Sequence, residues 1–201
     1  MAYLVLIAAY LLGSLPFGYI LSKLLLKTDI RNYGSGNIGA TNVLRVMGWW
    51  AALPVFILDL AKGLLAVLLA KTVSDLPAVY LGAGLLAMIG HSYPVFLKFK
   101  GGKAAATGIG VLIAISGWAV LVMLVAAALV IAVSRYVSVG SIVGAVMVPF
   151  AFWLLGYDLL HILFGALMAL LVVIRHHENI RRLIEGRESK LGQKAFTDKK
   201  G

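Results

Sequence analysis

The chain has 201 residues, of which 62% are hydrophobic and 13% are charged, and its formal net charge is +10. Its mean hydropathy is +0.99. Soluble domains carry roughly half apolar and a quarter charged residues, so this composition excludes an ordinary soluble protein and indicates an integral membrane protein. Cysteine is absent, which excludes disulfides, thiol nucleophiles and thiolate metal sites.

Six apolar stretches follow one another along the chain. Backbone polar groups must be paired within hydrocarbon, so each stretch is predicted to be helical. The first lacks the basic start and the cleavage site of a secretory signal, and we expect it to be a retained helix. The stretch 104–133 fits either one overlong helix or two short helices that meet near Ser116. The six stretches cover residues 2–22, 46–70, 76–97, 104–133, 137–155 and 159–174.

The distribution of Lys and Arg decides between one helix and two. Sixteen of these 18 residues lie at 23–45, 98–103, Arg135 and 175–200. With seven helices all four segments fall on one side, which is then cytoplasmic, whereas six helices would divide them. We therefore predict an all-α polytopic membrane protein with seven transmembrane helices, an outside N-terminus and a cytoplasmic C-terminus. Two of the helices, near 104–116 and 118–133, are then short.

The length of the chain leaves little room for a soluble domain. At about 20 residues per spanning helix, seven helices and their loops use most of the chain. We expect a single transmembrane domain over residues 1–188, followed by a polar, flexible tail over residues 189–201.

The first predicted cytoplasmic loop, residues 31–45, contains three glycines among small polar residues. Glycine lets backbone N–H groups approach an anion closely, and successive N–H groups form a concave anion site. An arginine that closes the loop can donate two hydrogen bonds to a phosphate. The alternative is a flexible turn of small residues packed between helices. The candidate phosphate-binding residues of this loop are Ser35, Gly36, Thr41, Asn42 and Arg45.

The second loop contains Gly101-Gly102-Lys103 directly before an apolar helix. We expect the glycine amides and the Lys103 ammonium to point at the same spot. The spacing G-x-x-x-x-G-K-[ST] is absent, so the motif does not support nucleotide binding. Lys98 and Lys100 are more typical of residues that mark the membrane edge.

The third loop, residues 134–141, is short and offers the hydroxyls of Ser138 and Ser141 as donors. Serine hydroxyls in membrane helices often bond back to their own helix, which is the simpler interpretation of this loop taken alone.

The C-terminal segment 175–188 has the pattern of an amphipathic helix. His176 and Asn179 are three residues apart and therefore share one helical face. Arg181 and Arg182 fit either an interfacial basic helix or a binding surface. The adjacent histidines do not form a metal pair, because neighbouring helical residues point in directions about 100° apart.

Two charges stand inside the second apolar stretch. Asp59 and Lys62 are three residues apart, the spacing at which helical side chains meet. Charges within a membrane are costly and usually paired. We interpret them as a mutual salt bridge that braces the bundle near the site, with a direct functional role as the alternative.

Three segments of the chain, 35–45, 90–103 and 175–188, resemble the three signature motifs of the bacterial acyl-phosphate:glycerol-3-phosphate acyltransferase family, the PlsY type. The resemblance extends over about residues 4–190, with the motifs in order and at family-like spacing. One departure is Ala104, where the family commonly has a further glycine.

The resemblance implies a membrane enzyme that makes the first acylated intermediate of bacterial phospholipids. Such an enzyme transfers a fatty acyl group from acyl phosphate to the 1-hydroxyl of sn-glycerol 3-phosphate. The products are lysophosphatidic acid and phosphate. It implies a multi-pass protein of the bacterial inner membrane with its active site at the cytoplasmic face. No cofactor, metal or nucleic acid is expected; the expected partners are both substrates, membrane lipid and a soluble enzyme that produces the acyl phosphate.

The resemblance also implies roles for individual residues. The phosphate groups would be held by Ser35, Gly36, Thr41, Asn42, Arg45 and Lys103, of which Arg45 and Lys103 offset charge on the leaving group. Ser141, His176 and Asn179 would complete the glycerol-phosphate side. His176 and a substrate phosphate oxygen are the two candidates for the general base. A Ser35 acyl-enzyme is a third, less favoured route, and an organic-phosphate transporter is the alternative function.

Overall fold

The computed structural model describes residues 1–193, which form helices and connecting segments without a strand. Two 3₁₀ turns, η1 (Ile30–Asn32) and η2 (Val95–Leu97), interrupt the connections. The helices are α1 (Ala2–Gly13), α2 (Phe17–Leu26), α3 (Ala40–Met47), α4 (Trp49–Val73), α5 (Pro77–Ser92), α6 (Ala105–Ile115), α7 (Gly117–Ser134), α8 (Val137–Leu154), α9 (Leu159–Arg175) and α10 (His177–Ile184).

Five segments within residues 1–193 are long and apolar enough to cross a membrane. A sixth is formed if α9 and α10, which meet at an angle of 56°, are counted as one span. This confirms an all-helical membrane protein. The five segments are Ala2–Leu26, α4, Pro77–Leu97, α7 and α8.

The stretch 104–133 forms two helices, as the charge distribution predicted. They are divided at Ser116, whose Oγ accepts a hydrogen bond of 3.2 Å from the amide of Ala119. The expected shortness holds for α6, which has 11 residues. It is wrong for α7, whose 18 residues are enough to span hydrocarbon at 1.5 Å per residue.

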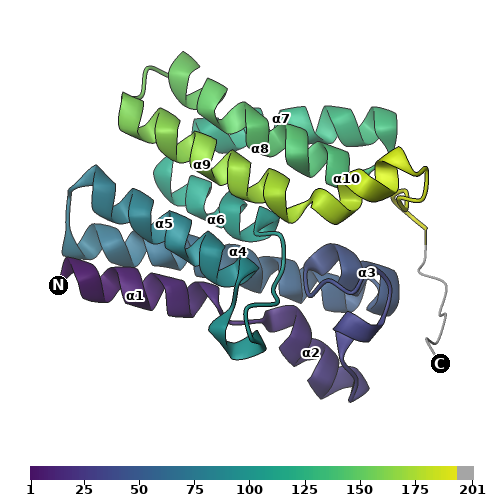
Figure 1. Ribbon diagram of the computed structural model, residues 1–201. Coiled ribbons are helices and arrows are strands. Elements are labelled where there is room, and N and C mark those ends of the chain that lie inside the picture. The colour runs from purple at the N-terminus through teal and green to yellow at the C-terminus, as the bar shows by residue number, and fades with distance from the viewer. Residues whose placement is uncertain (194–201) are drawn as a thin grey trace.

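The helices lie side by side in a bundle in which α1 packs along α5, α4 along α6, and α8 between α7 and α9 (Figure 1). Small residues allow these close contacts. A Cβ added at Gly13 would lie 2.1 Å from the carbonyl oxygen of Ala87, and one at Gly110 would lie 1.9 Å from that of Leu60. Without a hydrophobic force between helices in lipid, such close backbone contact is a main source of packing energy.

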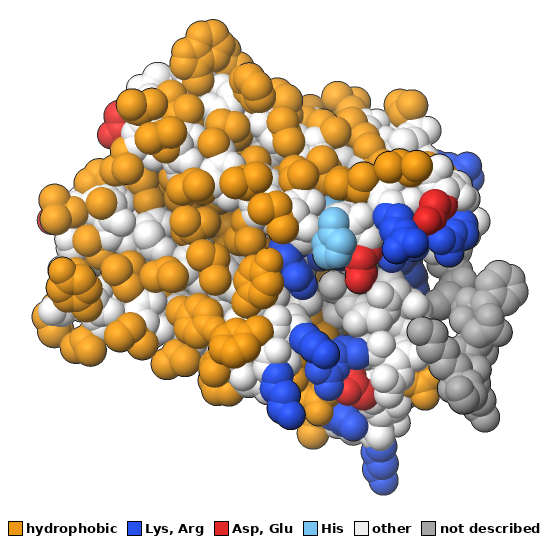
Figure 2. Space-filling view, in the orientation of Figure 1, with side chains coloured by type: hydrophobic (Ala, Val, Ile, Leu, Met, Phe, Trp, Pro, Cys, Tyr) orange, Lys and Arg blue, Asp and Glu red, His pale blue; other side chains and the backbone are white. Residues whose placement is uncertain are grey.

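Hydrophobic side chains cover most of the face seen in Figure 2, and the Lys and Arg side chains gather at one end of it. This is the end where α2, α3 and α10 lie (Figure 1). The basic segments that are far apart in the sequence are therefore neighbours in space.

Residues 189–193, the described part of the tail that was expected to be flexible, contact the bundle. The Leu191 amide donates to the carbonyl of Arg135 (2.7 Å), and the Lys190 ammonium lies 5.7 Å from the centre of the Tyr136 ring. Residues 194–201, the rest of that tail, lie outside the described part of the chain.

Candidate active site

A cavity of about 350 Å³ opens among the three predicted loops and extends between the helices. Eight of the nine candidate residues line it, although they come from five separate segments. Gly36 is the exception. Its φ of +72° places it in the left-handed region, where it shapes the first loop. The eight lining residues are Ser35, Thr41, Asn42, Arg45, Lys103, Ser141, His176 and Asn179.

Asn42 organises the first loop from the inside. Its side chain is 1% exposed, and its Oδ1 accepts a hydrogen bond of 2.8 Å from the Ser35 amide. Its Nδ2 donates to the carbonyls of Asn37 (2.8 Å), Tyr33 (3.1 Å) and Ile30 (3.4 Å). The amide of Asn42 is therefore engaged with the loop backbone, and this is a different use from the phosphate contact that the sequence suggested.

Three glycine amides of the two loops donate within the protein, so these three are not available to an anion. In the first loop Gly36 N–H donates to the Tyr33 carbonyl (3.0 Å) and Gly39 N–H to Asn37 Oδ1 (2.9 Å). In the second loop Gly102 N–H donates to the His91 carbonyl (2.9 Å). The sequence could not reveal this, because the acceptors are set by how each loop folds back.

The first turn of α3 offers other backbone N–H groups to the cavity. Ala40 and Thr41 begin this helix and line the cavity, and no side chain caps its N-terminus. Free N–H groups and the helix dipole favour an anion there. Arg45 lies one turn further on, and burial lowers the pKa of its guanidinium without neutralising it.

Lys103 faces the cavity from the opposite side. Its ammonium donates to Oδ1 of Asn179, and this contact joins the second loop to α10. Burial, with a smaller contribution from the Arg182 charge, lowers the pKa of Lys103 to about 8. The ammonium is thus largely protonated at neutral pH but poorly solvated, so an anion would be strongly attracted to it.

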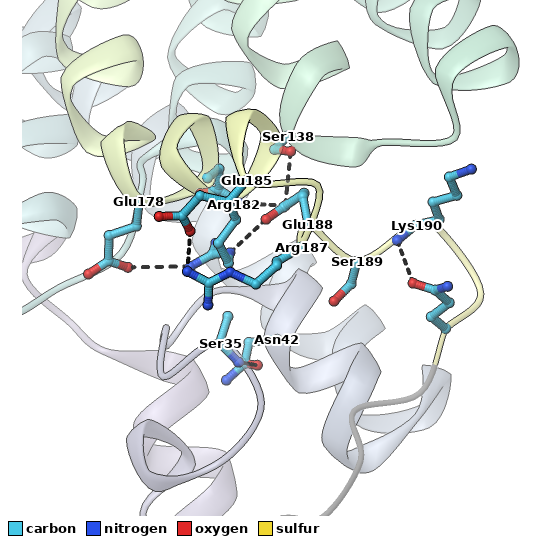
Figure 3. Close-up of polar contacts among 12 residues, drawn as sticks. Ser35, Asn42, Ser138, Glu178, Arg182, Glu185, Arg187, Glu188, Ser189 and Lys190 are labelled. Carbon is cyan, nitrogen blue, oxygen red and sulfur yellow. Dashed lines mark hydrogen bonds and ion pairs between the residues drawn. The ribbon is translucent and has the colours of Figure 1, made fainter.

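Glu188 is a central residue of the site that the sequence did not single out. The turn at Gly186 (φ +66°) brings its carboxylate back beside α10, where it is 6% exposed. Ser138 Oγ (3.0 Å) and Asn179 Nδ2 (2.7 Å) donate to Oε1, and Arg182 Nε donates to Oε2 (2.7 Å). Figure 3 shows this carboxylate between Ser138 and Arg182, across from the Ser35 loop.

These bonds change the expected roles of two further residues. Burial opposes ionisation of Glu188, but hydrogen bonds from Arg182 and Asn179 outweigh it and lower the pKa of the carboxyl. Arg182, which the sequence left between two interpretations, pairs with this carboxylate. Ser138 contacts Glu188, whereas Ser141 Oγ donates within its own helix to the Val137 carbonyl (2.9 Å).

His176 lies directly after α9 and is 3% exposed. Its Nδ1 is 2.8 Å from the carbonyl of Val172, which can only accept, so Nδ1 carries the proton and Nε2 is the basic nitrogen. Burial lowers the pKa of His176 to about 4, so the ring is neutral at pH 7.

Asp59 and Lys62 form the predicted salt bridge, with Lys62 Nζ 2.8 Å from Asp59 Oδ1. Both side chains are almost completely buried. Lys62 also donates to the Leu15 carbonyl (2.8 Å), which the break between α1 and α2 leaves free. The pair thus braces the bundle, and Asp59 lines the cavity as well.

The remaining wall of the cavity is apolar and extends between α6, α7, α8 and α9. Glycines at 108, 140 and 144 line this part and pack closely against neighbouring side chains and backbone, and methionines 88, 123 and 168 border it. A long hydrocarbon chain would be shielded from water in this part while its polar end lies among the charged residues. The cavity therefore suits a molecule that is apolar at one end and anionic at the other.

Comparison with known proteins identifies the family. The sequence model described as glycerol-3-phosphate acyltransferase matches residues 3–186. The chain belongs to the glycerol-3-phosphate acyltransferase family. This confirms the resemblance carried by the three motifs, and the protein is an acyltransferase.

Relatives from several bacteria cover nearly the whole chain. The glycerol-3-phosphate acyltransferase of Desulforamulus reducens is 47% identical over 191 residues, which are 95% of this chain and 96% of that protein. The enzyme of Thermoanaerobacter pseudethanolicus is 46% identical over 96% of this chain and 97% of its own. These alignments include all three loops that line the cavity.

Crystal structures of PlsY, an integral membrane glycerol 3-phosphate acyltransferase, have the same fold. Its glycerol 3-phosphate form superposes with a TM-score of 0.90, at 40% identity over 95% of this chain and 96% of that one. Its lysophosphatidic acid form gives a TM-score of 0.87, at 38% identity over 95% of both chains.

Proposed function

We propose that this protein transfers a fatty acyl group from acyl phosphate to the 1-hydroxyl of sn-glycerol 3-phosphate, with release of phosphate and lysophosphatidic acid. One observation carries the proposal: a single cavity joins an apolar wall to a cationic mouth formed by Arg45 and Lys103. Both substrates bear a phosphate, and only the donor bears a long hydrocarbon chain. The names of the relatives support glycerol 3-phosphate as the acceptor. The PlsY form with lysophosphatidic acid supports that lipid as the product.

The residues divide into two groups in this proposal. The phosphate group of the acyl phosphate is held at the start of α3. The Ser35 and Thr41 hydroxyls donate hydrogen bonds to it, and Arg45 is its counter-ion. Lys103 lies across the cavity, where its ammonium offsets the charge that develops on the departing phosphate. Asn179 and His176 face the acceptor. Because the mixed anhydride is already activated, positioning and charge neutralisation are sufficient for catalysis.

The proton of the attacking hydroxyl goes to a phosphate oxygen of a substrate in this scheme. With a pKa of about 4, His176 is a weak base at neutral pH. The second pKa of a phosphate monoester is about 6, so a phosphate oxygen is the stronger acceptor. His176 Nε2, which carries no proton, then accepts a hydrogen bond from the 2-hydroxyl of glycerol 3-phosphate and so orients the acceptor. A Ser35 acyl-enzyme would require a base beside Ser35, and the contacts of that loop support none.

The membrane arrangement belongs to the same proposal. We infer one transmembrane domain over residues 1–188 with seven passes, an outside N-terminus and the cavity mouth at the cytoplasmic face of the inner membrane. The gathering of Lys and Arg at one end of the bundle supports this orientation (Figure 2). Because α6 has only 11 residues, its pass requires that the helix be surrounded by a locally thin bilayer or by polar groups. A soluble enzyme that makes acyl phosphate would deliver the donor at this face.

The test is an assay of the purified protein in lipid nanodiscs with palmitoyl phosphate and radiolabelled glycerol 3-phosphate. We expect labelled lysophosphatidic acid and one phosphate released per product. Intact acyl phosphate without labelled lipid would overturn the proposal. Arg45→Ala and Lys103→Ala are each expected to lower kcat/KM at least about a hundredfold, in line with the loss of charge stabilisation at a transition state. Arg181→Gln, which changes an exposed arginine on α10, is the control and should retain activity.

A further inference from the structure

A second buried polar group lies directly behind the second loop. Asp59, Lys62 and His91 are 1%, 2% and 4% exposed. His91 Nδ1 is 3.5 Å from the same Asp59 oxygen that pairs with Lys62, and it makes no hydrogen bond within residues 1–193. The Asp59–Lys62 brace explains two of these three residues. It does not explain why a histidine is buried against them at the cavity wall.

The glycine turn of the second loop is seated on this histidine. Gly102 N–H donates to the His91 carbonyl (2.9 Å), and a Cβ at Gly102 would lie 2.0 Å from His91 Nε2. A Cβ at Gly101 would lie 2.2 Å from the same His91 carbonyl oxygen. No side chain fits between the turn and the ring. The glycines are therefore required by contact with His91, in addition to any need for a flexible turn.

Arg175 holds the same turn from the other side. Its Nε donates to the Gly102 carbonyl and its Nη2 to the Gly101 carbonyl, both at 3.0 Å. Its guanidinium lies 4.8 Å from the centre of the Tyr93 ring, which fixes the plane of the fork. The planar guanidinium suits this contact because its donors on separate nitrogens are held in a fixed fork.

We propose that His91, supported by Asp59, and Arg175 are positioning residues that clamp the Gly101–Gly102 backbone and so hold the Lys103 ammonium at the cavity mouth. A lysine side chain has many rotamers, and it is aimed only if the backbone that carries it is fixed. The residue after Lys103, Ala104, is also constrained, with a φ of +57° at full burial. The inference rests on the proposed role of Lys103.

A double-mutant cycle between His91 and Lys103 tests this inference. The activity of the unmodified protein is measured first, so that failure of the proposed function is recognised separately. His91→Gln should lower kcat/KM about tenfold or more in the unmodified background, but by less than about twofold in a Lys103→Ala background. Equal losses in both backgrounds would show a merely structural role and overturn the inference.

His161→Gln is the matched control. His161 is also buried, at 7% exposed, and contacts an aspartate, with Nδ1 2.6 Å from Asp158 Oδ1. It lies at the start of α9, at the far end of the bundle from α10 (Figure 1). Any loss that it causes should be the same with and without Lys103. If the loss of kcat/KM caused by His161→Gln depended on the presence of Lys103 as strongly as the loss caused by His91→Gln, the clamp would be contradicted.

A second experiment keeps Lys103 in place and so does not require measurable activity in a Lys103→Ala variant. Gly102→Ala alone should lower kcat/KM strongly, because the added methyl meets the His91 ring. The double variant His91→Ala/Gly102→Ala removes the ring, and we expect it to be at least about fivefold more active than Gly102→Ala alone. If the double variant is no more active than the single one, the ring is not what holds the turn.

Arg175→Lys tests the other half of the clamp. Lysine keeps the charge, but all its donors are on one nitrogen, so it cannot reproduce the two hydrogen bonds that Arg175 donates from Nε and Nη2. We expect kcat/KM to fall about tenfold with unchanged thermal stability, and to fall much less when Lys103 is already absent. An active Arg175→Lys variant, equal to the Arg181→Lys control on exposed α10, would remove Arg175 from the proposal.

Discussion

Replacement of Lys103 by methionine should make the protein more stable and inactive at the same time. Methionine has a similar length and fills the same space without a charge. Burial lowers the pKa of Lys103 from 10.5 to about 8. At 1.36 kcal/mol per pKa unit, this difference corresponds to a cost of about 3 kcal/mol for keeping the buried ammonium charged.

The sign of this cost sets its pH dependence. Between about pH 8 and 10.5 the folded protein binds fewer protons at Lys103 than the unfolded chain does. The cost is therefore fully present below pH 8 and is relieved as the pH rises from there toward 10.5. The variant also loses the hydrogen bond to Asn179, worth about 1 kcal/mol. We expect a net gain of about 2 kcal/mol at pH 7 that shrinks above pH 8.

Thermal unfolding in nanodiscs at pH 7 and pH 9.5, together with the pH profile of kcat/KM, measures both effects. Lys103→Met should unfold at a higher temperature at pH 7, with a smaller difference at pH 9.5. The unmodified protein should lose activity about tenfold per pH unit above about pH 8, and Lys103→Arg should remove this loss because arginine stays charged. A less stable Lys103→Met variant, or a flat profile to pH 9.5, would refute the reasoning.

Three further outcomes follow from the site. Arg45→Lys should raise KM for the acyl phosphate about tenfold with a smaller change in kcat, because a lysine cannot donate the two parallel hydrogen bonds of an arginine to a phosphate; an unchanged KM for the acyl phosphate would contradict this role. Asn42→Ala removes four hydrogen bonds within the first loop and should lower thermal stability together with activity, measured on the same preparation. Glu188→Gln should destabilise the protein at pH 7, and this destabilisation should shrink as the pH falls below 4.5. The lowered pKa of Glu188 gives stability that is complete above its ordinary value of 4.5 and is lost as the pH falls through the folded-state pKa.

Local pattern alone was sufficient for the long apolar helices and for several contacts, but it missed the break between α1 and α2 and the short helix α3. Long apolar stretches predict helices because no other structure pairs its backbone groups in hydrocarbon. The i, i+3 spacing of Asp59 and Lys62 predicted their salt bridge, since neighbours on one helical turn meet whatever the rest of the fold does. The four basic segments likewise predicted a common charged end of the bundle. Each of these inferences depends on residues close together in the sequence or on composition.

The partner of each polar group was decided only by tertiary structure. The Gly102 amide turns to the His91 carbonyl, and the Asn42 amide turns into its own loop, although both types of group commonly bind phosphate. Ser138 reaches Glu188 across 50 residues of sequence, while Ser141 bonds within its helix. A donor binds the acceptor that packing brings within about 3 Å, and packing is a property of the whole bundle. The sequence by itself therefore determined the long apolar helices and a set of candidate residues for the chemistry. The tertiary structure decided which of these candidates face the cavity and which other residues hold them in place.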